Sequence, residues 1–149
     1  MKRVNQSISL YSLGLILVGK IHETESFQTE YLSQIKENQM LDEIKQIELN
    51  NSNISDQFKK IFNENLPSTQ RPFIACICEI DQDFSQFEIL AHIITEKRSF
   101  KVIPIIKIAN FNMLPSYFID LLLANVSEFL VGEVDDKTDS LLKERLAGY

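Results

Sequence analysis

Apolar strand-like runs alternate with amphipathic helix-like runs along the chain from Leu13 onward. Runs that are apolar at consecutive or alternate positions fit strands, whereas apolar residues three and four positions apart fit helices. These two spacings predict strands at Leu13–Ile21, Ile44–Asn50, Phe73–Ile80, Lys101–Ile108 and Glu128–Val134. They predict a helix after each strand, at Ser26–Glu37, from Asn53 or Ser55 through Phe62, and at Asp83–Lys97, Pro115–Val126 and Asp136–Leu146.

The regular alternation predicts an α/β fold in which a parallel sheet lies between two helical layers. Because connections between parallel strands are right-handed, we expect a doubly wound, flavodoxin-like (βα)5 sheet of five strands in the order 2-1-3-4-5. The second strand, Ile44–Asn50, is the most amphipathic and fits an edge. Pro104 lacks a ladder donor, so we expect it to mark the start of the fourth strand. Residues 1–149 would then form a single domain.

Composition narrows the classes of partner. The chain has 149 residues and a net charge of −6. A negative chain is poorly suited to nucleic acid, because phosphate contacts need clustered Lys and Arg, but the charge does not exclude small anionic ligands. No run approaches the roughly 18 apolar residues of a membrane span. Cys76 and Cys78 alternate within one apolar strand, which predicts two buried thiols in a reducing cytoplasm and no metal site.

Glycines are too few for the common nucleotide-binding loops. Such loops need several glycines so that backbone N–H groups can approach a phosphate. The chain has Gly14, Gly19, Gly132 and Gly148, and none belongs to a GxGxxG or GxxxxGK[ST] motif. We therefore expect no dinucleotide or nucleoside-triphosphate site of the standard kinds, and no cofactor.

The segments that end the predicted strands carry the most specific pattern. The first strand ends in LILVGKIHET, the third in ICEID, the fourth in PIIKIAN and the fifth in FLVGEVD. In order and spacing these segments resemble the receiver domains of bacterial two-component response regulators, most closely from Phe73 onward. The resemblance implies a former reaction site at Gly19, Lys20, Glu79, Ala109 and Gly132.

Every one of these positions departs from the receiver pattern. Receivers carry an acidic pair, a phosphate-accepting Asp, a hydroxyl residue and a Lys where this chain has, in order, Gly19 with Lys20, Glu79, Ala109 and Gly132. Phosphorylation needs a carboxylate nucleophile, a divalent cation held by the acidic pair and a Lys to balance charge. The resemblance therefore implies a pseudo-receiver without metal or phosphotransfer. We expect a signalling module that acts through a protein partner or as a homodimer.

The same site predicts one ion pair. In the flavodoxin-like order, Lys20 and Glu79 follow adjacent strands, so we expect the Lys20 ammonium to replace the lost cation and pair with Glu79.

Other polar residues leave alternatives open. Glu79, Asp81 and Asp83 form an acidic cluster that suits either a cation or helix capping. His22 follows the first strand and suits either a ligand or an exposed position. Glu88 lies in SQFEILAHI before VIPII, an arrangement similar to Toll/interleukin-receptor-like domains. That similarity implies the rival function, an NAD-processing or nucleotide-binding domain that uses Glu88.

The helix Pro115–Val126 has almost no polar face. A helix that packs one side on a sheet normally shows polar residues on the other. Exposed apolar patches on soluble proteins usually mark partner sites. We therefore predict an interface built on Tyr117, Phe118, Leu121 and Leu122, together with the fifth strand and last helix.

Overall fold

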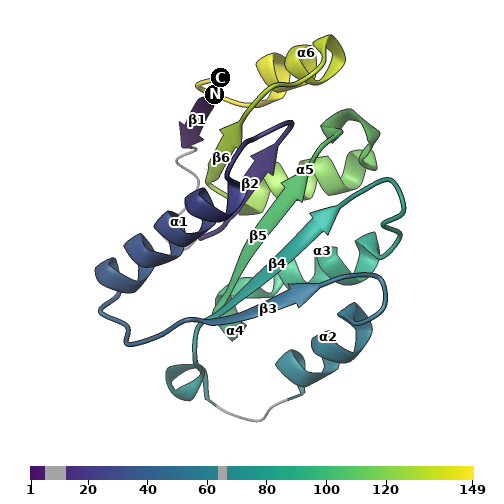
Figure 1. Cartoon of the computed structure of the whole chain (residues 1–149). Helices are drawn as coiled ribbons and strands as arrows, with labels where there is room; N and C mark the ends of the chain where they lie inside the picture. The colour runs from purple at the N-terminus through teal and green to yellow at the C-terminus, as the bar shows by residue number, and fades with distance from the viewer. Residues whose placement is uncertain (6–12, 64–66) are drawn as a thin grey trace.

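The computed structural model describes residues 1–5, 13–63 and 67–149. Figure 1 shows a sheet with helices packed around it. Its strands are β1 (Lys2–Asn5), β2 (Leu15–Val18), β3 (Lys45–Leu49), β4 (Ile74–Ile80), β5 (Val102–Ile108) and β6 (Glu128–Val131). The α-helices are α1 (Thr24–Asn38), α2 (Ile54–Phe62), α3 (Phe87–Thr95), α4 (Lys97–Phe100), α5 (Ser116–Asn125) and α6 (Asp136–Arg145). Two 3-10 turns, η1 (Ser68–Gln70) and η2 (Phe111–Met113), complete the described elements.

The sheet is α/β and mostly parallel, as predicted, but its strand count and order differ from the prediction. Six strands run in the order β1-β6-β2-β5-β4-β3, so the expected five-stranded order 2-1-3-4-5 is wrong. The additional strand, β1, pairs antiparallel with β6, while the other pairings are parallel. The amphipathic strand β3 does lie at an edge.

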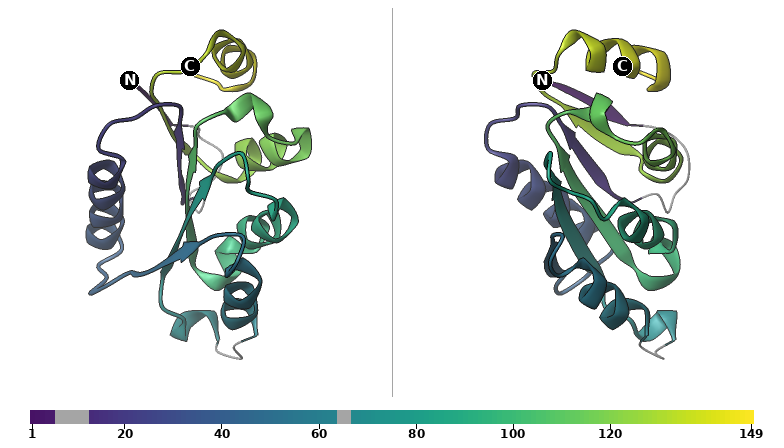
Figure 2. Two further views of the ribbon diagram at one scale, coloured as in Figure 1. Left: turned by 45° about the vertical axis from the view of Figure 1, so that its right-hand side comes forward. Right: turned by 90° about the vertical axis from the view of Figure 1, so that its right-hand side faces the viewer.

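The direction of each crossover explains which helices cover which face. The connection through α1 leads from β2 past β5 and β4 to the far edge at β3. The connections through α2, α3 and α5 lead back in the opposite direction. Since crossovers are right-handed, opposite directions place helices on opposite faces. Figure 2 shows α1 alone on one face and α2, α3 and α5 together on the other.

The core consists of two apolar clusters, one on each face of the sheet. β4 and β5 are buried on both faces along most of their length, as their continuous apolar runs predict. Cys76 and Cys78 both belong to the larger cluster, which confirms that the two thiols share a face. Burial raises the pKa of each thiol to about 12, so neither is a reactive nucleophile at neutral pH.

Two local predictions failed because tertiary contacts override them. Asp83 does not begin a helix: α3 begins at Phe87. The Asn51 side chain instead holds the preceding loop, donating to the carbonyl of Asp83 and accepting from the N–H of Ser85. Pro104 lies inside β5 rather than at its start. The pairing of β2 with β5 begins one residue later, at Ile105, so the missing donor costs no bond of that ladder.

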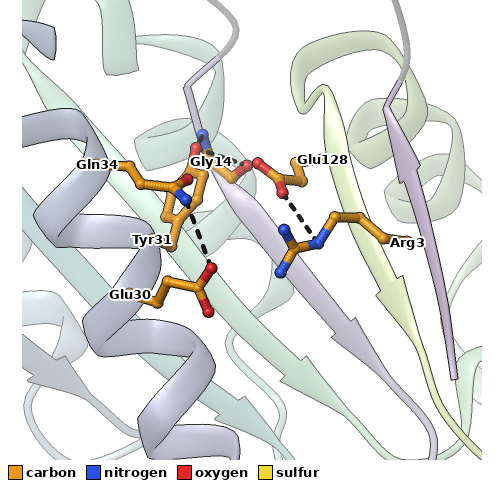
Figure 3. A network of polar contacts seen from close by, with 6 residues as sticks. All are labelled: Arg3, Gly14, Glu30, Tyr31, Gln34 and Glu128. Atoms are coloured by element: carbon orange, nitrogen blue, oxygen red, sulfur yellow. Dashed lines mark hydrogen bonds and ion pairs between the residues drawn. The ribbon is translucent and has the colours of Figure 1, made fainter.

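A polar contact fixes α1 against the sheet. The hydroxyl of Tyr31 accepts from the N–H of Gly14 at 2.7 Å and donates to the carbonyl of the same residue at 3.0 Å. Figure 3 shows this contact beside the ion pair of Arg3 with Glu128, which joins β1 to β6 over 3.6 Å. Burial raises the pKa of Tyr31 well above its usual range, so the hydroxyl stays protonated and keeps both bonds.

No helix in the described part of the chain is long and apolar enough to cross a membrane.

Candidate functional site

A groove of about 410 Å³ opens at the carboxyl ends of β2, β5 and β4. The connection after β2 leads to the α1 face and that after β5 to the opposite face, so this edge is a topological switch point, where α/β sheets bind ligands. We call it the carboxyl-edge groove. Its walls come from the ends of these strands and the start of α1: Leu17, Gly19, Lys20, Ile21, His22, Thr24, Glu79, Lys107, Ile108 and Ala109.

The structure brings together the residues that the receiver resemblance selects. Gly19, Lys20, Glu79 and Ala109 all line the carboxyl-edge groove. Gly132 lies directly behind it, against the backbone of Lys20. They converge because the carboxyl ends of parallel strands meet at one edge of the sheet.

The two glycines of this set have a structural reason. After β2 the chain crosses the end of β6, where Lys20 and Glu133 exchange backbone hydrogen bonds of 2.9 and 3.1 Å. A Cβ atom on Gly132 would overlap the carbonyl oxygen of Lys20, and one on Gly19 would overlap that of Glu133. Gly19 also has a left-handed φ of +82°. Side chains at these two positions are therefore excluded by the backbone crossing.

The predicted pair of Lys20 with Glu79 is wrong. β5 lies between β2 and β4, so the two residues follow strands that are not neighbours. No ion pair joins them among the ion pairs of the described residues. The residue opposite Glu79 is Lys107 of β5, which points to the same face of the sheet in the parallel register.

The groove therefore offers the ammonium groups of Lys20 and Lys107, the carboxylate of Glu79, the imidazole of His22 and the hydroxyl of Thr24. Lys107 lies on β5, between Lys20, which follows β2, and Glu79, which lies on β4. No three His, Cys, Asp or Glu side chains gather as a metal site within residues 1–5, 13–63 and 67–149. This set can bind an anion or a polar partner group, but it holds no acidic pair and no cysteine.

Asp81 and Asp83 of the predicted acidic cluster lie in the loop after β4, and they take part in the structure of that loop. The Asp81 carboxylate accepts from the N–H of Asp83 at 2.9 Å, which is the contact of an Asx turn. Both carboxyl groups are exposed. The rival residue Glu88 is also exposed, on the first turn of α3, and it does not line the carboxyl-edge groove.

The predicted interface on α5 needs correction. Phe118 and Leu122 are fully buried in the core and cannot contact a partner. Leu121 is half-buried, and Tyr117 is 50% exposed. Met113, just before α5, is 66% exposed. Met113 also lines a small cavity of about 110 Å³ with Phe84, Phe87 and Leu114, at the carboxyl ends of β4 and β5.

Sequence reasoning missed Lys107 and Met113. Lys107 is the single charge in the run VIPIIKI, and a charge within a buried strand was the available signal. Met113 lies in the short turn η2, for which hydrophobic spacing gives no signal.

No protein-family model matches the chain, and no curated protein matches it.

Proposed function

We propose that the chain is a non-catalytic, receiver-like signalling module that acts by self-association through an apolar patch beside its carboxyl edge. The patch consists of Met113, Tyr117 and Leu121. The observation that carries the proposal is the exposure of two large apolar side chains, Met113 and Tyr117, within one turn and the helix that follows it. Large exposed apolar groups that cluster usually mark a partner site.

Loss of phosphotransfer is the second part of the proposal. It is supported by the groove itself, where glycine is required at Gly19 and Gly132 by the backbone crossing. One carboxylate of the acidic pair, at position 19, and the phosphate-neutralising Lys, at position 132, have no room there. The strand order differs from the order that the receiver resemblance implies, so topology gives no support to that resemblance.

A second copy is the occupant we favour for the patch. In a two-fold dimer each copy contributes the same surface, so a small patch is used twice. Burial of apolar surface contributes about 25 cal/mol per Å² before the costs of association. The ion pair of Asp120 with Arg145 lies beside the patch and would form part of a polar rim.

Light scattering during size exclusion tests this proposal. We expect the wild-type chain to be dimeric at high concentration, and Met113→Lys and Tyr117→Lys to be monomeric with unchanged circular dichroism. Met40→Lys is the matched control, because Met40 is 91% exposed at the end of α1, away from the patch. A monomeric wild type, or dissociation by the control substitution, would contradict self-association through this patch.

A further inference from the structure

The last helix, α6, contacts both elements that carry the apolar patch. It packs against the turn η2, which contains Met113. Its Arg145 forms an ion pair with Asp120 of α5, the helix that carries Tyr117 and Leu121. The arrangement of the patch therefore depends on where α6 lies as well as on the core beneath η2 and α5.

Thr138 is the residue through which α6 makes a polar contact with η2. Its side chain is 1% exposed, and its hydroxyl donates to the amide oxygen of Asn112 at 3.3 Å. Asn112 directly precedes Met113 in η2. A buried hydroxyl is destabilising unless it has a hydrogen-bond partner, so this contact favours one position of η2 against α6.

Thr138 is itself fixed at the start of α6. The carboxylate of Asp135, the N-cap residue, accepts from the N–H of Thr138 at 2.8 Å. Bonds from the N–H and from the hydroxyl of Thr138 hold the pKa of Asp135 below its usual range. The capped first turn of α6 thus presents a hydroxyl group to η2 from a fixed position.

The turn η2 is short and depends on anchors outside itself. Its internal hydrogen bonds run from the N–H of Met113 to Asn110 at 3.1 Å and from that of Leu114 to Phe111 at 3.2 Å. Such 3-10 turns have poorer hydrogen-bond geometry than α-helices. Phe111 and Leu114 are buried in the core, whereas Met113 is exposed. The outward direction of Met113 therefore depends on the anchoring of η2 by the core and by the contact of Asn112 with α6.

We propose that α6 sets the strength of self-association through the contact of Thr138 with Asn112, which holds η2 in the conformation that exposes Met113. Thr138 is a positioning residue, because it is buried and lies outside the patch. The effect on dimerisation rests on the proposed function, whereas the effect on η2 can be measured in a monomer. Displacement of α6 would then weaken self-association without any change in the residues of the patch.

Methionine-methyl NMR and hydrogen exchange test the effect on η2, at a concentration low enough to keep the chain monomeric. The chain has three methionines, so Met1 and Met40 serve as internal references for Met113. Thr138→Val removes the hydroxyl and should shift the Met113 signal. It should also speed exchange of the N–H groups of Met113 and Leu114 roughly fivefold, as expected for the loss of one hydrogen bond. Thr138→Ser keeps the hydroxyl and should remain close to wild type.

Ser140→Ala is the matched control, because it removes an exposed hydroxyl from the same helix, and it should change neither measurement. Asn112→Ala tests the contact from the side of η2, even where Thr138→Val does not fold. Thr138→Val also removes the hydroxyl interaction with Asp135, and the double variant Asn112→Ala/Thr138→Val separates the two effects. If the contact is shared, the double variant should speed exchange of the Leu114 N–H no more than the stronger single variant does.

Light scattering at high concentration then measures self-association. Thr138→Val should weaken dimerisation roughly twofold or more, because both copies must present Met113, and Ser140→Ala should not. A monomeric wild type would overturn the self-association, while the exchange of η2 would still decide the coupling. Unchanged exchange in Thr138→Val and Asn112→Ala, or equal changes in Ser140→Ala, would overturn the coupling of α6 to η2. A disturbed η2 with unchanged dimerisation would overturn its role in self-association.

Discussion

Gly132 packs so closely against the end of β2 that a Cβ atom on it would overlap the carbonyl oxygen of Lys20. This contact lets Lys20 and Glu133 form their backbone bridge, which closes the β2–β6 side of the carboxyl edge. The open groove is consequently displaced toward β5 and β4. The absence of a side chain at Gly132 therefore follows from packing.

Gly132→Ala should lower the free energy of unfolding by about 1–3 kcal/mol, the usual cost of forcing an extra group into a packed site. Gly148→Ala is the comparison, since Gly148 has a left-handed φ of +86° while its Cβ would lie 3.7 Å from Val4 in ordinary contact. The Gly148→Ala substitution therefore measures the cost of backbone strain alone, with no steric overlap of the new Cβ atom. Urea denaturation measures both, and a smaller loss for Gly132→Ala than for Gly148→Ala would contradict the packing argument.

Tyr31→Phe should lower the free energy of unfolding by about 1–3 kcal/mol, because it leaves buried backbone groups of Gly14 without their hydroxyl partner. Tyr117→Phe is a suitable control, since it keeps the apolar ring of the patch and removes only a hydroxyl on a half-exposed side chain, for which the described residues show no hydrogen bond. It should change the free energy by less than about 0.5 kcal/mol. Equal effects of the two substitutions in urea denaturation would show that the Gly14 contact contributes little.

Small phosphodonors should not phosphorylate the chain. Glu79 has Lys107 opposite it, and the described part of the chain holds no cluster of carboxylates, His or Cys beside it that could bind the metal that phosphotransfer needs. After incubation with acetyl phosphate and Mg²⁺, intact-mass spectrometry should find the unmodified mass. A stoichiometric, acid-labile adduct at Glu79 would contradict the loss of phosphotransfer.

The hydrogen bond between Tyr149 and Asp139 of α6 should make the stability of the protein depend on pH in the acidic range. The Tyr149 hydroxyl donates to Asp139 at 2.6 Å, and this bond, with that from Lys143, holds the pKa of Asp139 below its usual range. A lowered carboxyl pKa contributes stability that is present above the unfolded-state pKa and is lost as the pH falls through the folded-state pKa. Tyr149→Phe should therefore raise the pKa of Asp139 and lower the melting temperature more at neutral than at strongly acidic pH.

Carboxyl NMR titration of wild type and Tyr149→Phe checks the pKa, and thermal melts across the acidic range check stability. The same bond raises the pKa of Tyr149 to about 12, so its contribution should persist through the mildly alkaline range and disappear only as the pH rises through that value. An Asp139 titration that is the same in both proteins would contradict the proposed link.

The sequence predicted the elements whose signals are local. β4 and β5 followed from continuous apolar runs, and α6 began at Asp136 as expected. β1 gave little signal, because only Val4 of its four residues is buried. The strand order was wrong because hydrophobic spacing does not determine how far the α1 connection travels across the sheet before β3.

The residues of the candidate site were predicted from the sequence, but their pairing was not, because the pairing depends on the strand order. Gly19, Lys20, Glu79 and Ala109 lie at the same edge in any sheet of parallel strands, and here β2, β5 and β4 are neighbours, which brings them into one groove. Pairing within the site depends on which strands are neighbours, so the ion pair of Lys20 with Glu79 was wrong. The burial of Phe118 and Leu122 was also missed, because an all-apolar helix sequence does not indicate which face turns inward.

The antiparallel strand β1 has a consequence for aggregation. Without it, β6 would present an unpaired edge whose residues Phe129, Leu130 and Val131 are apolar, and such edges pair with other chains. The opposite edge, β3, is protected by its own Lys45, Gln46 and Glu48. Besides the ladder with β6 and the buried Val4, the described residues hold β1 through the Arg3–Glu128 ion pair and the Lys2 ammonium, which lies 4.5 Å from the centre of the Tyr149 ring. A fusion or truncation that removes β1 would therefore turn a protected sheet edge into a template for intermolecular strand addition.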